Sequence, residues 1–174
     1  MKKLLVTLVA AVTLLFSGCE WSETTITNTA TTAGNIAMLT WFSIQNPDQT
    51  VKDILKDVVA NITTATVQVA EGKTYLDSFL PQVQELANKN EKLTSNQKML
   101  ISAGAVVILN GIDTFLDSNE KVKTDAALVN KVVSAFGKGC LSVLNLSSDS
   151  KEIKRARAVN GIVTGKTVSC SAGK

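Results

Sequence analysis

The chain of 174 residues has no histidine. Histidine is the usual general acid or base of enzymes near neutral pH and the most common transition-metal ligand. The G-x-S-x-G motif of serine hydrolases and the full spacing of a nucleotide-binding glycine loop are also missing. Asp113, Asp117 and Glu120 fall near one helix face, but they lack the spacing of a calcium-binding loop. We therefore expect a protein that is not an enzyme and that holds no metal or cofactor.

The first apolar segment is too short to cross a membrane. Residues 4–16 carry no charge and follow Lys2 and Lys3. A helix that spans the hydrocarbon core needs about 20 apolar residues, whereas a cleaved signal peptide has a positive start and a shorter apolar region. We expect residues 1–18 to be a signal peptide that is removed from the mature protein.

The end of this segment, Phe16-Ser17-Gly18-Cys19, resembles the lipobox of bacterial lipoproteins. The class usually has leucine in place of Phe16, and Phe16 is too large for the small-x-small site of an ordinary signal peptide. The resemblance implies that Cys19 is joined to a diacylglycerol and becomes the acylated first residue. It also implies the outer membrane, because Glu20 stands where an aspartate would retain such a protein in the inner membrane. The alternative is an ordinary secretory signal followed by an unmodified Cys19.

The mature chain has almost no net charge. The 18 basic residues include Lys2 and Lys3, so removal of the signal peptide leaves 16 basic and 15 acidic residues and a net charge of +1. This balance gives no indication of nucleic-acid binding. The 156 residues that remain are enough for one domain with a continuous core.

Two cysteines, Cys140 and Cys170, remain once Cys19 carries lipid. Disulfides persist in the periplasm, and a bridge between these two would close a loop of about 30 residues and stabilise the fold by about 3 to 4 kcal/mol. We expect this disulfide. The alternative is two separate buried thiols, which suits Cys140 because it lies on an apolar helical stripe.

Apolar residues recur at helical spacing along most of the mature chain. Pro81 is expected to kink or divide one of the helices, and a capping-box pattern at Thr94 and Gln97 predicts a helix start near Ser95. β-Branched residues in 62–69 leave a strand as an alternative there. The helices are predicted at residues 35–45, 47–69, 75–87, 95–116, 125–146 and 148–159.

The fold class that these patterns predict is a mainly-α bundle of four to six helices in residues 34–174, with a small hairpin or a loop at the C-terminus. Residues 99–109 are apolar nearly all round, but Asn110 and Asp113 interrupt the run before it could span a membrane, which favours a central buried helix over a membrane-inserting hairpin. Residues 19–33 are predicted to be a lipidated N-terminus and a tether, because six threonines lie between Thr24 and Thr32. A frayed first turn of the next helix is the alternative.

One short predicted helix concentrates positive charge and contains both arginines of the chain. A partner's acidic surface or lipid phosphates could bind these side chains, although a solvated helix face is the commoner explanation of such a cluster. The cluster consists of Lys151, Lys154, Arg155 and Arg157.

The sequence favours an outer-membrane lipoprotein whose helical domain faces the periplasm and works by contact with another envelope protein, as an assembly, scaffolding or exclusion factor. The alternative is a lipoprotein that encloses a small apolar ligand between two helices. Space for such a ligand is expected beside glycines at helical positions, which are Gly104, Gly111, Gly137 and Gly139.

Overall fold

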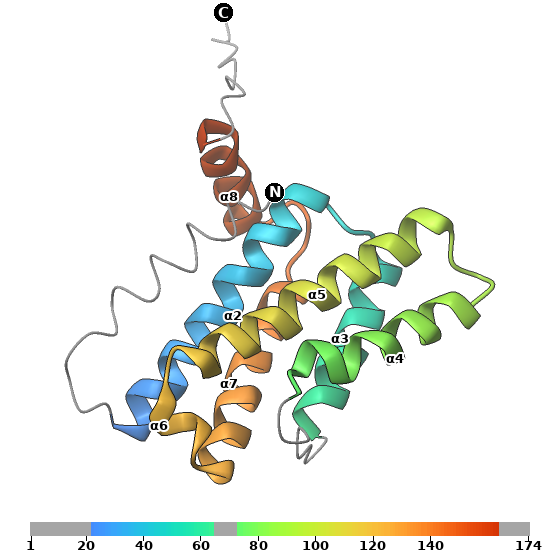
Figure 1. Ribbon diagram of the computed structural model, residues 1–174. Coiled ribbons are helices and arrows are strands. Elements are labelled where there is room, and N and C mark those ends of the chain that lie inside the picture. The colour runs from blue at the N-terminus through green and yellow to red at the C-terminus, as the bar shows by residue number, and fades with distance from the viewer. Residues whose placement is uncertain (1–21, 65–72, 164–174) are drawn as a thin grey trace, which may run out of the picture.

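The computed structural model of the protein describes residues 22–64 and 73–163. These residues form helices and contain no strand, which confirms the predicted mainly-α bundle. Figure 1 shows α8 projecting from one end of the molecule. The predicted C-terminal hairpin and most of the segment 62–69 lie outside the described residues. The helices are α2 (Glu23–Gln45), α3 (Gln49–Thr64), α4 (Tyr75–Lys89), α5 (Ser95–Asp117), α6 (Glu120–Lys123), α7 (Ala126–Leu144) and α8 (Lys151–Val163).

Helix α2 begins at Glu23, so the predicted tether is wrong for residues 23–33. The Ser22 side chain caps the helix by accepting a hydrogen bond from the backbone N–H of Thr25. The threonines fit a helix because their hydroxyls donate to carbonyl oxygens one turn earlier, as Thr31 does to Thr27. Small and apolar residues then recur every four positions and are buried, namely Ile26, Ala30, Gly34 and Met38.

Helices α2 and α7 form the most extensive helix pair of the bundle and run parallel to each other. Near the start of both helices, the Glu23 carboxylate pairs with the Lys131 ammonium at 2.6 Å. Further along both, Asn35 Nδ2 donates a hydrogen bond to Ser142 Oγ at 2.8 Å. The two helices therefore keep nearly the same register from the Glu23–Lys131 pair to the Asn35–Ser142 pair.

Two glycines allow the backbones of α2 and α7 to touch. A Cβ atom added at Gly34 would lie 2.1 Å from the carbonyl oxygen of Phe136, and one at Gly139 would lie 2.0 Å from that of Thr31. Any side chain at either position would meet main-chain atoms of the partner helix. The close approach of this pair thus depends on glycine in both helices.

Helix α5 is the central helix and contacts α2, α3 and α4. Thr94 and Gln97 form the predicted capping box at its start. Both α5 and α7 are long and apolar enough to cross a membrane, but half of the apolar window of each is buried inside the bundle. Leu109 and Ile112 of α5 are almost completely buried. This burial favours the predicted central helix over a membrane-inserting hairpin.

Several helix boundaries differ from the prediction. Helix α3 begins at Gln49 rather than at residue 47, and the carboxylate of Asp48 accepts the backbone N–H of Val51 at 2.9 Å. Helix α4 continues through Pro81, and α8 continues past its predicted end at residue 159 to Val163. The polar connection after α5 contains the short helix α6.

Candidate functional site

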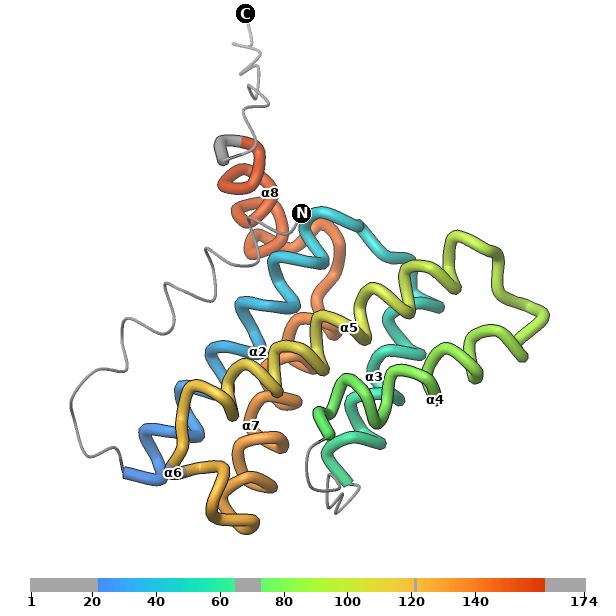
Figure 2. Tube along the Cα trace, viewed as in Figure 1, coloured from blue at the N-terminus to red at the C-terminus, as the bar shows by residue number. Residues whose placement is uncertain are grey.

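The four predicted basic residues lie together on α8 and define what we call the basic helix face, made of Lys151, Lys154, Arg155 and Arg157. The first three are exposed, and Arg157 is partly buried. Glu152 is the only acidic residue of the helix. Lys154 lies 3.9 Å from Asp149 across an exposed ion pair, which contributes little stability. The helix therefore presents a net positive charge at the end of the molecule where it projects (Figure 2).

Helix α8 is attached to the C-terminal end of α2. Ile153 is completely buried, and Asn160 Nδ2 donates a hydrogen bond to Ser43 Oγ. Arg157 Nη2 donates to Asn46 Oδ1 at 2.6 Å. Asn46 is the C-cap of α2 and has a φ of 47°, a left-handed conformation that asparagine adopts more readily than most residues. These contacts fix the orientation of the basic helix face relative to the bundle.

The predicted lipidation site, Cys19, and one half of the predicted disulfide, Cys170, lie outside the described residues. Cys140 is a free thiol with no exposed surface, and its Sγ lies 3.5 Å from the carbonyl oxygen of Gly34. This position between α2 and α7 matches the alternative of a separate buried thiol. The disulfide itself stays a prediction.

Burial raises the pKa of the Cys140 thiol to about 12. The thiolate is the reactive form, so at pH 8 only about one folded molecule in 10⁴ carries it. We expect Cys140, in a Cys170→Ser chain, to resist iodoacetamide until denaturant is added. Because the folded pKa lies above the ordinary value of 9.0, this thiol should also lower the free energy of unfolding as pH rises from about 9 towards 12. Rapid labelling of the native protein, read by mass spectrometry, would contradict the buried position.

Of the three acidic residues expected near one helix face, Asp113 and Asp117 lie on α5 and make structural contacts, whereas Glu120 is the first residue of α6. Asp113 accepts the backbone N–H groups of Tyr75 and Leu76 at 2.7 and 2.9 Å and so holds the start of α4. Burial raises the pKa of Asp113, and the two backbone hydrogen bonds oppose that shift. Asp117 pairs with Lys123 of α6. Among the described residues, no group of three or more acidic or cysteine side chains is placed to hold a metal ion.

The space expected beside the four glycines is filled by the protein itself. A Cβ at Gly104 would lie 2.6 Å from Leu55 Cδ1, and one at Gly111 would lie 2.5 Å from Phe136 Cζ. Gly139 faces the backbone of α2, and Gly137 faces the side chains of α3. These glycines permit close helix packing, and the space that the alternative hypothesis expected beside them is occupied.

The sequence did not predict a buried cation, Lys52, which lies near the segment that leads into α8. Lys52 of α3 is 7% exposed, and its Nζ donates to the carbonyl oxygen of Leu146 at 3.2 Å. The ammonium also lies 5.5 Å from the centre of the Phe42 ring, within range of a cation–π interaction. The local pattern of apolar residues does not distinguish Lys52 from the other lysines of the chain. It connects α3 to the segment that leads into α8.

Comparison of the chain with protein-family models, with curated proteins and with solved structures found no match.

Proposed function

We propose that the protein is an outer-membrane lipoprotein, anchored through Cys19, whose bundle faces the periplasm and works by contact with another envelope protein. The observation that carries this proposal is the lipobox-like segment ending at Cys19, which stands only four positions before the first residue of α2. A folded domain thus follows the expected lipid attachment point directly. Assembly, scaffolding and exclusion of other components are the roles that such an anchored, non-catalytic domain would perform.

The basic helix face is the contact surface that we propose for this role. Lys151, Arg155 and Val159 stand four residues apart and so share one exposed stripe of α8, with Val159 58% exposed. Arginine next to an exposed apolar side chain is typical of protein interfaces. An acidic protein surface with a small apolar recess would complement this stripe by charge and shape.

Site-specific cross-linking in intact cells tests this surface. A photoreactive residue at Ala158, which is exposed on α8, should give a discrete adduct with one envelope protein. Lys154→Glu together with Arg155→Glu should reduce the adduct about tenfold by opposing an acidic partner. Lys138→Glu is the control, because Lys138 is exposed on α7, outside the basic helix face. An adduct that persists when both charges are reversed, or no adduct at all, would contradict the assignment of this surface.

A further inference from the structure

The length of chain between the proposed lipid and the bundle limits where the membrane can lie. Glu23, the first residue of α2, is four residues from Cys19. Four residues span at most about 14 Å when fully extended. On the proposed acylation, the start of α2 is therefore held within about 14 Å of the acylated residue.

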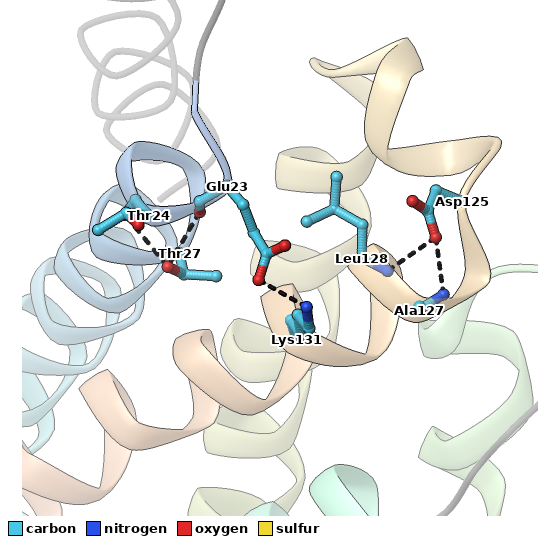
Figure 3. A network of polar contacts seen from close by, with 7 residues as sticks. All are labelled: Glu23, Thr24, Thr27, Asp125, Ala127, Leu128 and Lys131. Carbon is cyan, nitrogen blue, oxygen red and sulfur yellow. Dashed lines mark hydrogen bonds and ion pairs between the residues drawn. The ribbon is translucent and has the colours of Figure 1, made fainter.

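The start of α2 is also fixed to the start of α7. Figure 3 shows Glu23 pairing with Lys131, beside the turn where Asp125 caps α7. The Asp125 carboxylate accepts the backbone N–H groups of Ala127 and Leu128 at 2.9 and 3.1 Å. Helix α6 precedes this turn and contacts both α5 and α7. We call the surface formed by the starts of α2 and α7 and by α6 the proximal end.

Several charged side chains at the proximal end are engaged within the protein, whereas Glu120 of α6 is exposed. Glu23 pairs with Lys131, Asp117 pairs with Lys123, and Asp125 accepts backbone N–H groups. This end can therefore approach lipid headgroups without presenting a cluster of charges of one sign. Its position at the membrane is set by the short connection to Cys19 and not by electrostatic attraction.

The basic helix face lies at the opposite end of α2. The contacts of α8 with Ser43 and Asn46 are 20 or more residues from Glu23. A helix rises 1.5 Å per residue, so about 30 Å separates the two ends. Helix α2 contains no lysine or arginine, and its exposed positions near the start include Thr24 and Asn28. A helix that lies on a membrane surface uses basic and large apolar side chains, and the exposed positions in the first turns of α2 carry neither.

From these contacts we infer that the bundle stands on its own membrane by the proximal end and holds the basic helix face about 30 Å away, turned towards the periplasm. The partner of the proximal end is the bilayer that carries the acyl chains. The partner of α8 is then not that bilayer, which excludes its lipid phosphates as the anionic surface that α8 meets. This inference rests on the proposed acylation of Cys19.

Depth-dependent quenching tests the orientation with the full acylated protein. The protein is placed in vesicles of phosphatidylcholine and phosphatidylglycerol that contain a quencher on the lipid headgroup. Single fluorophores are attached to cysteines introduced by Glu120→Cys, Thr32→Cys or Val159→Cys, three exposed positions. A Cys170→Ser background is used, in which Cys140 is buried. We expect strong quenching at residue 120, weaker quenching at 32 and none above background at 159.

A longer connection gives the matched control. Insertion of about 16 glycine and serine residues after Trp21 adds a flexible span of about 20 to 24 Å. The inserted chain should still float with the vesicles but lose the quenching at residue 120. Quenching at 159 equal to that at 120, or strongest at 32, would overturn the orientation even if the protein floats. Failure of the unaltered chain to float would contradict the lipid anchor as well.

Discussion

Replacing Gly139 by alanine should lower the free energy of unfolding by about 3 kcal/mol. The new Cβ would lie 2.0 Å from the Thr31 carbonyl oxygen and 2.7 Å from the Asn35 backbone nitrogen. Because both are main-chain atoms of α2, no rotation of a side chain relieves the overlap, and α2 must move away from α7. Urea titration of the mature protein in detergent, followed by far-ultraviolet circular dichroism, measures the change.

Gly137→Ala is the matched control, two residues away in the same helix. Its Cβ would lie 2.4 Å from Thr63 Cγ2, which belongs to a partly exposed side chain of α3 that can rotate. Alanine gains about 1 kcal/mol of helix propensity over glycine at both positions, so the net change at Gly137 should stay within about 1 kcal/mol. Equal losses for the two variants would show that backbone contact between α2 and α7 does not determine the stability of this pair.

Cys19→Ala should remove membrane attachment completely. A single thiol carries the proposed lipid, and several acyl chains at about 0.8 kcal/mol per buried methylene hold a protein on a bilayer almost permanently. The altered chain should take up no radioactive fatty acid and should leave the membrane fraction. Incorporation of label into Cys19→Ala would contradict the assignment of this residue.

Glu20→Asp separates the destination from the anchor. This variant keeps Cys19, so fatty-acid labelling should be unchanged. On the resemblance to bacterial lipoproteins, the unaltered protein should sediment with outer membranes and the Glu20→Asp protein with inner membranes. Sedimentation of both with the same membrane would show that Glu20 does not determine the destination.

Helix periodicity accounts for most of the fold. The helical spacing of apolar residues predicted helix α3, and Leu55, Val58 and Ile62, which follow this spacing, are buried. The capping box at Thr94 and Gln97 placed the start of α5 correctly. Both are local patterns, in which the residues that determine the structure lie within one or two turns of each other.

The start of α2 could not be predicted from local preference. Threonine is a weak helix former, and the burial of Ile26, Ala30 and Gly34 in the bundle, where α2 packs most extensively on α7, outweighs that preference. The partner residues lie more than 100 positions away in the sequence, as Glu23 and Lys131 do. Tertiary packing thus determines this helix.

The candidate site was predicted in part. The grouping of Lys151, Lys154 and Arg155 on one exposed helix follows from their spacing, and the structure places them so. The attachment of that helix through Asn46 and Arg157 was not predictable, because it joins side chains 111 positions apart. The position of Asn46 just before a proline is typical of a helix N-cap, whereas Asn46 ends α2 with a positive φ.

Mass spectrometry of the mature N-terminus tests the central claim most directly. The protein extracted from membranes should begin at Cys19 and carry the added mass of a diacylglycerol and an amide-linked acyl chain on that residue. A mature chain that begins at any other residue, or a Cys19 of unmodified mass, would contradict the anchored bundle and the membrane orientation derived from it.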